Sequence, residues 1–272
     1  MSSYEESLAQ AAGVGTAELP SEDPLPADGR ERVVVCMKWG RKFPGEDVNR
    51  LYRMVRRWLP GDFRFLCLTD DDSGFLPEVE PRPIPQVPVV GHRNDHGWKK
   101  LGLFGYDLEG VQGEALYLDL DVVIVDQLTP FFEVDGEFRI IKDYRPFRLR
   151  HSFTGNSSVV RFRVGEHGDL IRMVEGYGDE LTRAFRNEQE VLSHYAQEKG
   201  ILQYWPREWC PSFKHDCVPP IPLGWFVPPR KPDGAKVIIF HGRPQPEEAV
   251  RGEGSKWYRA IKPTPWLESY LD

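Results

Sequence analysis

Short apolar runs and one strongly amphipathic segment mark the first half of the chain. Arg32–Met37 is rich in β-branched residues and predicts a buried strand. Within Gly45–Leu59 the apolar side chains recur at helical spacing with four arginines between them, which predicts an amphipathic helix. Phe63–Leu68 predicts a second strand, which ends in an acidic loop. A strand, a helix and a strand in this order favour a parallel sheet.

The same reasoning places elements along the rest of the chain. Residues 1–30 are rich in Gly, Pro, Ser and acidic residues and predict a flexible tail, so that 31–272 form a single domain. Residues 77–90 predict an extended segment, and residues 201–232, with eight prolines, predict irregular structure. Further strands are expected at 138–142, 156–162 and 237–240, and further helices at 98–108, 169–175 and 188–198, while 114–125 is a long apolar run that contains two aspartates.

Composition and charge narrow the class of protein. The chain has 272 residues and a net charge of −7, which argues against a protein that binds duplex nucleic acid. No apolar run is long enough for a transmembrane helix, and the N-terminus lacks the features of a signal peptide. We therefore expect a cytoplasmic protein. Peripheral attachment to the inner membrane surface stays open, although no basic amphipathic helix supports it.

The four cysteines are expected to be free thiols. Cys36 and Cys67 lie in apolar runs and resemble small buried hydrophobic residues. Cys210 and Cys217 are close enough in sequence for a disulfide or a shared metal, but a chain without an export signal favours free thiols.

Asp119 and Asp121 lie inside the apolar run 114–125. On an extended strand, residues two apart point to the same side. Two carboxylates in apolar surroundings are costly unless something compensates their charge, and a divalent cation with oxygen ligands does so. The pair therefore predicts a Mn²⁺ or Mg²⁺ site that grips a nucleoside diphosphate. The alternative is that one aspartate caps a turn and the other is solvated.

The ends of the first two expected strands carry candidate nucleotide contacts. Ligands of open α/β sheets bind outside the carboxyl ends of the strands. Lys38 and Trp39 lie at the end of the first strand, where Trp39 is suited to stack on a nucleobase or, alternatively, to pack on the next helix. Asp70 follows the second strand and is placed near the ribose.

The last expected strand ends in a second group of candidates. His241 follows this strand and is suited to be a third metal ligand, because a neutral imidazole binds Mn²⁺; a hydrogen-bonded structural histidine is the alternative. Gly242 lets the backbone approach a phosphate closely, and Arg243 supplies a compensating charge.

Two expected helices begin with polar residues that suit a ligand. Lys99 and Lys100 lie at a helix start, where a cation is unfavourable unless an anion such as a diphosphate is near. Glu188 and Gln189 follow Asn187, a predicted N-cap. They are either part of a capping motif alone or polar groups that steady positive charge on a sugar ring.

Four segments occur in the order shown by one enzyme family: Tyr117-Leu-Asp-Leu-Asp121, Gly155-Asn-Ser-Ser-Val-Val-Arg-Phe162, Asn187-Glu-Gln-Glu-Val-Leu192 and Phe240-His-Gly-Arg-Pro-Gln-Pro246. With them the sequence resembles the metal-dependent GT-A glycosyltransferases, most of all the family-8 type (glycogenin and galactosyltransferase relatives) and related bacterial enzymes. Three departures are Gln245, where many relatives have lysine, a shorter spacing between His241 and Gly242, and Glu188-Gln-Glu190 in place of Asp-Gln-Asp.

The resemblance implies an α/β GT-A fold with a mixed, mostly parallel central sheet flanked by helices. It also implies a hexosyltransferase-like enzyme that uses a nucleotide sugar, in particular a UDP-sugar, and retains the configuration at the anomeric carbon. The acceptor, a saccharide or another hydroxyl compound, is not identified. The resemblance places Asn156 behind the donor sugar, Lys100 at the family's lysine, and Glu188 and Gln189 as catalytic candidates beneath the sugar.

Two other functions stay open at this point. Asp119-Leu-Asp121-Val-Val123 also fits the first motif of haloacid-dehalogenase-type phosphatases, although that motif normally opens its domain. The chain can also be a binding module that keeps the fold and a nucleotide-sugar site without turnover. A second metal site at His92, Asp95 and His96 is weakly indicated, because flanking glycines favour a loop.

Overall fold

The computed structural model of the protein describes residues 31–87, 97–108, 110–111, 113–144, 153–254 and 261–271. The expected tail at 1–30 and the group of His92, Asp95 and His96 lie outside the described residues. Among the helices described, none combines the length and apolar character needed to cross a bilayer.

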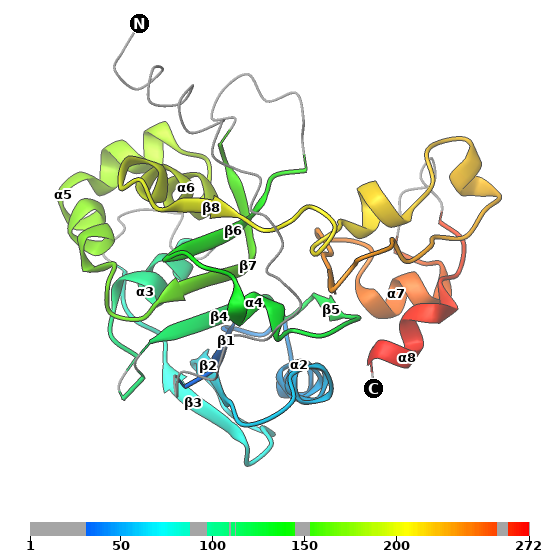
Figure 1. Ribbon diagram of the computed structural model, residues 1–272, viewed down its shortest axis with the longest axis horizontal. Helices are drawn as coiled ribbons and strands as arrows, with labels where there is room; N and C mark the ends of the chain where they lie inside the picture. Colours follow the sequence, from blue (N-terminus) through cyan, green and yellow to red (C-terminus); the bar gives the residue numbers. More distant parts are fainter. Residues whose placement is uncertain are drawn as a thin grey trace, which may run out of the picture.

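A central sheet organises the molecule (Figure 1). Its seven strands are β1 (Val33–Lys38), β2 (Arg64–Thr69), β3 (Val79–Pro83), β4 (Glu114–Leu118), β6 (Phe138–Lys142), β7 (Gly155–Arg163) and β8 (Leu202–Tyr204). They lie in the order β3-β2-β1-β4-β7-β6-β8. The pairs β1–β2, β1–β4, β2–β3 and β6–β8 are parallel, and β7 runs antiparallel to both of its neighbours. The sheet is thus mixed and mostly parallel, as predicted.

Helices cover both faces of this sheet. The helices are α2 (Gly45–Trp58), α3 (Lys100–Gly105), α4 (Pro130–Glu133), α5 (Gly168–Ala184), α6 (Glu188–Glu198), α7 (Pro246–Arg251) and α8 (Glu268–Leu271). Short turns η1 (Phe213–Cys217), η2 (Leu223–Trp225) and η4 (Pro265–Leu267) lie in the C-terminal part. One core contains α2 together with the C-terminal segments, and the other contains α3, α5 and α6.

The two faces follow from the alternation of side chains along each strand. In β1, Val33, Val35 and Met37 pack in the core of α3, α5 and α6, whereas Val34 and Cys36 pack in the core of α2. Because side chains two apart in a strand share a face, a parallel strand buried on both sides reads as a continuous apolar run. This is why the strand at 33–38 was visible in the sequence.

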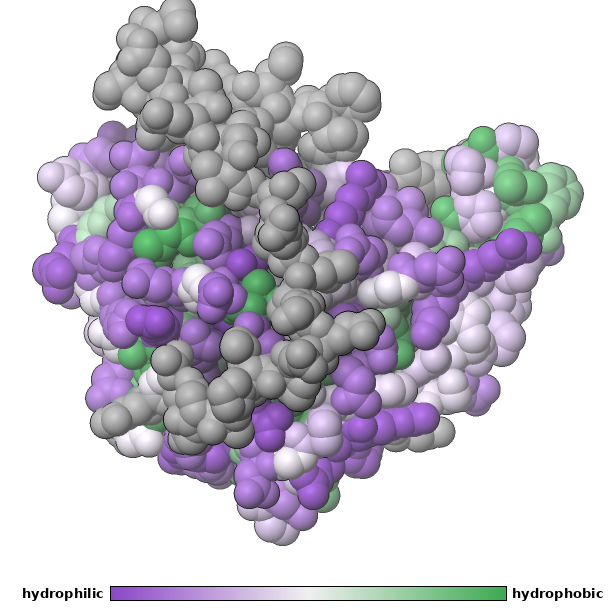
Figure 2. All heavy atoms as spheres, in the orientation of Figure 1, coloured by the Kyte–Doolittle hydropathy of each residue, from purple (hydrophilic) through white to green (hydrophobic). Residues whose placement is uncertain are grey.

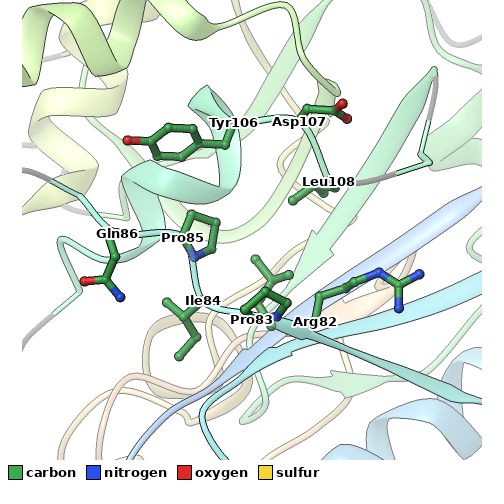
Figure 3. A pocket seen from close by; sticks show the side chains of 9 residues that line it. Arg82, Pro83, Ile84, Pro85, Gln86, Tyr106, Asp107 and Leu108 are labelled. Carbon is green, nitrogen blue, oxygen red and sulfur yellow. The ribbon is translucent and has the colours of Figure 1, made fainter.

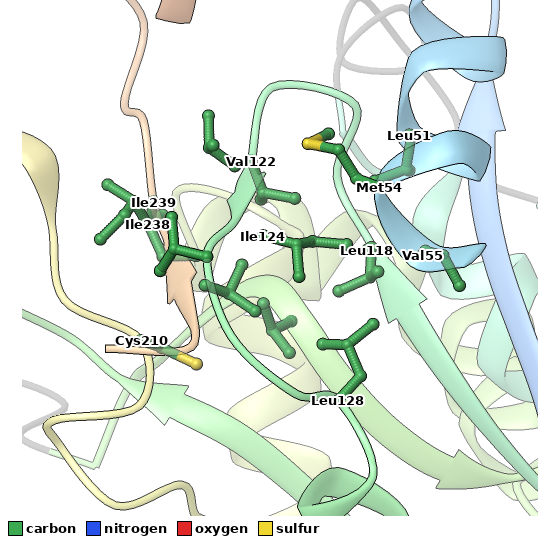
Figure 4. Packing of buried hydrophobic residues seen from close by; sticks show 14 of the residues in the cluster. Leu51, Met54, Val55, Leu118, Val122, Ile124, Leu128, Cys210, Ile238 and Ile239 are labelled. Carbon is green, nitrogen blue, oxygen red and sulfur yellow. The ribbon is translucent and has the colours of Figure 1, made fainter. Parts of the chain in front are cut away.

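The apolar run at 114–125 is two strands with the aspartates between them, so the expectation that both aspartates lie on one extended strand was wrong. β4 ends at Leu118, a turn follows, and β5 (Val123–Ile124) pairs with β9 (Val237–Ile238) in a separate two-stranded sheet. Figure 4 shows Ile124 of β5 in one apolar cluster with Ile238 of β9 and with Met54 and Val55 of α2. The run is apolar throughout because both halves are buried, and apolar character alone does not reveal the break.

Several other boundaries differ from expectation. α3 is shorter than the helix expected at 98–108, and α5 extends well beyond 169–175. The extended segment 77–90 contains the edge strand β3, where proline is tolerated because one side of the strand carries no ladder. The irregular segment 201–232 contributes the opposite edge strand, β8. All four cysteines are buried and free, as predicted.

Candidate functional site at the end of strand β4

The strongest candidate site lies where β4 leaves the sheet. Ala115 and Tyr117 belong to the core that contains α3 and α6, so the alternation directs Asp119 toward the same helices. The backbone N–H of Asp119 donates to the carbonyl oxygen of Ser158 at 2.9 Å. The neighbouring strand β7 therefore fixes the backbone at the first carboxylate of the predicted pair.

A lysine from α3 meets this carboxylate. Lys100 is buried, and its Nζ atom lies 2.5 Å from Oδ1 of Asp119. The hydroxyl of Tyr117 donates to the same oxygen at 2.7 Å. The predicted anion near Lys100 is thus, in the protein alone, the side chain of Asp119.

The charges around this pair favour its ionised form. Burial alone would raise the pKa of Asp119, but the charge of Lys100 and the hydrogen bonds from Lys100 and Tyr117 outweigh burial and hold the pKa below its usual value. Burial opposes the charged form of Lys100, yet the carboxylates of Asp119 and Glu188 raise its pKa. A buried lysine is therefore kept cationic by an excess of nearby negative charge.

Asp121 experiences the opposite balance. Its carboxyl is partly buried, and burial together with the charge of Asp119 raises its pKa to about 6. Lys42 and Lys100 reduce this shift without cancelling it. The turn after β4 therefore holds two carboxylates close enough to repel each other, with too little positive charge for both.

Glu188 joins the same cluster from the start of α6. Its N-cap is Asn187, as predicted, whose side chain accepts from the backbone N–H of Glu190 at 3.2 Å. The hydroxyl of Ser157 donates to Oε1 of Glu188 at 3.2 Å. Gly97 lies directly against this carboxylate: a Cβ atom there would lie 2.4 Å from Oε2, so a larger residue would force the side chain of Glu188 to move. Gln189 is half-buried, and its backbone carbonyl accepts from the hydroxyl of Ser193 at 2.6 Å.

His241 lies just beyond β9, beside η1. Its carbonyl accepts from Nζ of Lys214, and its ring contacts that of Tyr144 with 5.0 Å between centroids. The Nε2 atom is buried and has no hydrogen-bond partner within the described part of the chain. Burial, with Lys214 and His215 nearby, lowers the pKa of His241 to about 4. The imidazole is therefore neutral at physiological pH, and one of its nitrogens is available to a ligand.

The predicted nucleotide contacts after β1 and β2 form hydrogen bonds with each other's loops. Lys38 is buried and donates to the carbonyl oxygen of Asp71 at 2.7 Å. The carboxylate of Asp70 accepts from the backbone N–H of Gly40, at 3.0 Å from its Oδ2. Trp39 is half-buried against the core that contains α3. These contacts give Lys38 and Asp70 a clear structural role in joining the two loops.

The remaining predicted residues differ in how far they are engaged. Oδ1 of Asn156 accepts from the backbone N–H of Ser158 at 2.9 Å, so its buried side chain shapes the start of β7. Gly242 and Arg243 are exposed, and Nε of Arg243 lies 3.5 Å from a carboxylate oxygen of Glu248. The side chain of Gln245 donates to the carbonyl of Gly242 at 2.8 Å and caps α7.

Two contributors were not anticipated from the sequence. Tyr117 supplies a hydroxyl to Asp119, and Ser157 supplies one to Glu188. Tyr117 had a usable signal, because it lies two residues before Asp119 on the strand and must share its face. Ser157 had none, because its partner is distant in sequence.

The donor set fits a divalent cation by chemistry, although the side chains are not gathered around one point. The carboxylate of Asp119, which is paired with Lys100, the poorly compensated carboxylate of Asp121 and a neutral imidazole are oxygen and nitrogen donors that Mn²⁺ accepts, and Mg²⁺ accepts the carboxylates. Within the described residues, no group of three or more His, Cys, Asp or Glu side chains is arranged to hold a metal ion. The assignment of Asp119, Asp121 and His241 as ligands therefore stays a prediction.

A separate cavity lies beside the edge strand β3 (Figure 3). It has a volume of about 340 Å³ and is bounded by residues 82–86, at the end of β3 and beyond it, and by residues 106–108 after α3. None of the predicted site residues lines it. The cavity is therefore distinct from the cluster at the end of β4.

Solved structures of several glycosyltransferases share this arrangement of elements. Galactosyltransferase LgtC, in complex with donor and acceptor sugar analogues, matches with a TM-score of 0.60 and 13% identity over 88% of this chain and 95% of that chain. GlyE of Streptococcus pneumoniae TIGR4 matches with a TM-score of 0.54 and 12% identity, over 89% of this chain and 60% of that chain. The bifunctional WbbM matches with a TM-score of 0.53 and 14% identity, over 82% of this chain and 48% of that chain. No protein-family model and no curated protein sequence matches the chain.

The fold is the GT-A fold. This confirms the predicted fold class, and at these identities the likeness concerns the fold alone. In this GT-A chain the strand that precedes Asp119 is the fourth along the sequence and the central strand of the sheet. A haloacid-dehalogenase-type phosphatase would carry its aspartates on the first strand of its domain, so the phosphatase alternative loses its support.

Proposed function

We propose that this chain is a metal-dependent glycosyltransferase, which moves a sugar from a nucleoside diphosphate donor, in particular a UDP-sugar, to a hydroxyl acceptor. The observation that carries the proposal is the cluster at the carboxyl end of β4. There Asp121 has too little compensating positive charge, and Lys100 pairs with Asp119 while the charge of Glu188 also acts on it. A GT-A sheet binds its ligand at this edge, where strand ends present polar groups.

The acidic pair and His241 are the proposed holders of the diphosphate through a Mn²⁺ or Mg²⁺ ion. When bound, the ion supplies Lewis-acid stabilisation of the charge that develops on the leaving diphosphate. The residues suit this role because the carboxylate of Asp121 is poorly compensated in the protein alone and Nε2 of His241 is buried without a partner among the described residues. A neutral imidazole and ionised carboxylates are the forms that bind metal.

Positive groups around the acidic pair are the proposed contacts of the phosphates. Lys100 keeps its charge in a buried position, and such a cation both orients Asp119 and attracts a diphosphate. Arg243 is exposed beside Gly242, a glycine with φ of 68°, so the backbone there is open to a ligand. The nucleoside is proposed to lie over Trp39, with Lys38 and Asp70 shaping the loops around it.

The donor sugar is proposed to lie over Asn156, Glu188 and Gln189. In an oxocarbenium-like transition state the ring carries positive charge, which a fixed carboxylate stabilises. Glu188 is buried and held by Ser157, whereas Gln189 is half-buried, so Glu188 is the better placed of the two. Retention at the anomeric carbon follows only from the family-8 resemblance. LgtC was solved with donor and acceptor sugar analogues, and this supports a nucleotide sugar and a saccharide as ligands here.

The test is turnover of nucleotide sugars. Purified protein is incubated with a panel of UDP-sugars and Mn²⁺, and release of UDP by hydrolysis or transfer is measured. Asp121→Asn should remove the metal-dependent activity, whereas Asp126→Asn, a carboxylate paired with Lys236 away from the cluster, should retain it. Metal-dependent UDP binding without release from any donor would instead indicate a binding module without turnover. Equal activity in the two variants would contradict the site.

A further inference from the structure

A compact apolar turn projects from the C-terminal part of the protein. We call residues 220–226, which contain η2, the apolar turn. Its large hydrophobic side chains are exposed: Ile221 by 55%, Leu223 by 51%, Trp225 by 43% and Phe226 by 74%. Figure 2 shows hydrophobic atoms gathered at the right-hand end of the molecule, over the segment that Figure 1 draws in gold. An exposed group of this kind marks an interaction surface.

The apolar turn is built to keep this shape. The backbone N–H groups of Trp225 and Phe226 donate to the carbonyls of Pro222 and Leu223 at 3.1 and 3.0 Å. The N–H of Gly224 donates to the carbonyl of Pro220 at 3.1 Å, and a Cβ atom there would lie 2.6 Å from the carbonyl oxygen of Pro219. The N–H groups of Gly224, Trp225 and Phe226 are thus satisfied within the turn, which lowers the cost of moving this backbone out of water.

The base of the turn is fixed to the body of the protein. The N–H of Arg230 donates to the carbonyl of Cys217 at 3.0 Å, which closes the segment into a loop. Nε1 of Trp266 donates to the carbonyl of Pro229 at 3.0 Å. The apolar side chains are thus presented on a rigid support, so little conformational entropy is lost when they become buried.

The charged residues of the segment that contains the turn are basic. Between the flanking Asp216 and Asp233 there is no acidic residue, and Arg230 and Lys231 are exposed, although the chain carries a net charge of −7. The Nζ atom of Lys231 lies over the ring of Tyr270 at 5.6 Å from its centroid. Apolar and aromatic side chains bordered by basic residues fit a surface with an apolar interior and an anionic outer layer.

We propose that the apolar turn inserts into the interfacial region of an anionic lipid bilayer. Tryptophan is enriched at this depth because its ring is apolar and its N–H stays near water. Arg230 and Lys231 would then meet the anionic headgroups. A second copy of the chain fits less well, because a symmetric contact would bring the basic residues of both copies into one interface. The proposal goes beyond the proposed function and does not depend on it.

The test is vesicle flotation of the full chain, with EDTA present and no nucleotide, so that donor binding does not contribute. Vesicles of phosphatidylcholine alone are compared with vesicles that also contain phosphatidylglycerol. The wild-type protein should float with the anionic vesicles. The double variant Trp225→Ser/Phe226→Ser should bind the anionic vesicles at least roughly tenfold more weakly, because it lacks two aromatic side chains that the bilayer would bury. Arg230→Glu should weaken binding to the anionic vesicles selectively.

Tyr177→Ser is the matched control, since Tyr177 is 62% exposed on α5, away from the turn. It should bind like the wild type, and thermal unfolding should show that all variants are folded. Wild-type protein that floats with neither vesicle, or a double variant that binds as well as the wild type, would overturn the proposal. So would a concentration-dependent dimer that the double variant abolishes, because the turn would then be a self-association surface.

Discussion

The Nζ atom of Lys100 lies 2.5 Å from Oδ1 of Asp119; the lysine begins α3, which packs on one face of the sheet, and the aspartate follows β4 of that sheet. The side chain of Lys100 is 9% exposed and that of Asp119 is 21% exposed. This ion pair holds a cation among the carboxylates of Asp119, Asp121 and Glu188. We infer that the same lysine prepares the site for a diphosphate.

Lys100→Met should therefore destabilise the protein. Removing the cation leaves Asp119, Asp121 and Glu188 without their common partner, and breaking a buried pair from one side is costly. Because Asp119 is partly exposed, we expect a loss of about 2–3 kcal/mol in the free energy of unfolding, measured in urea with EDTA present. Lys99→Met is the control and should change the free energy by less than about 0.5 kcal/mol. Equal unfolding free energies of the two variants would show that the pair of Lys100 and Asp119 does not stabilise the fold.

Asp121→Asn should stabilise the protein in the absence of metal. Burial and the charge of Asp119 raise the pKa of Asp121 to about 6, from an ordinary value of 3.8. The folded protein thus holds the proton more tightly than the unfolded chain, and stability falls as the pH rises from the unfolded pKa through about 6. The amide removes this cost, so the free energy of unfolding should rise on the order of 1 kcal/mol at neutral pH. The gain should disappear below the unfolded pKa.

The control for this comparison is Asp126→Asn, which affects only a half-exposed pair with Lys236. It should leave the unfolding free energy nearly unchanged at both pH values. If Asp121→Asn lost stability at neutral pH, Asp121 would be acting as a structural hydrogen-bond acceptor and not as a poorly compensated carboxylate.

Metal-dependent binding of UDP should decline as the pH falls through about 6. A carboxylate binds a cation only when deprotonated, and the pKa of Asp121 is raised to about 6 in the protein alone. The pKa of His241 is lowered to about 4, so its imidazole stays neutral over this range and does not set the midpoint. Titrations at a series of pH values with constant Mn²⁺ measure the dependence. Affinity that stays constant down to pH 4 would assign the metal to other residues.

Glu188→Gln should separate binding from transfer. The variant keeps the size of the side chain and a partner for Ser157, so UDP affinity in Mn²⁺ should change little. The turnover of the donor should fall by roughly a hundredfold, because the charge that stabilises the sugar ring is lost. Gln189→Ala is the comparison, since Gln189 is half-buried. Its backbone carbonyl, which accepts from Ser193, is unchanged by the substitution. A greater loss in Gln189→Ala would exchange the roles of the two residues.

Much of the fold could be predicted from local patterns. The strand at 138–142 and the helix at 188–198 match β6 and α6 in both bounds, because each is bordered by residues that end its period. The break after Leu118 could not be predicted, since the run stays apolar where the chain leaves one sheet and enters another. Strand β8 was also missed, because its burial depends on a parallel partner, β6, that is distant in sequence.

The candidate site shows the same division. Asp119 and Asp121 were recognisable because carboxylates are rare in an apolar run. The contact between Lys100 and Asp119 depends on how α3 packs on the sheet, and a sequence does not specify that packing. Lys38 and Asp70 were assigned to a ligand from their positions alone, whereas in the structure they bind Asp71 and Gly40. Side-chain partners across loops are set by tertiary structure and were not visible in the chain.

The central claim is that the turn after β4 binds a nucleoside diphosphate through a metal ion. Calorimetric titration of UDP into the purified protein, first with Mn²⁺ and then with EDTA, tests it most directly. We expect saturable binding in Mn²⁺ that EDTA abolishes and that Asp121→Asn loses while Asp126→Asn retains it. Binding of equal strength with and without the metal, or in both variants, would contradict the claim.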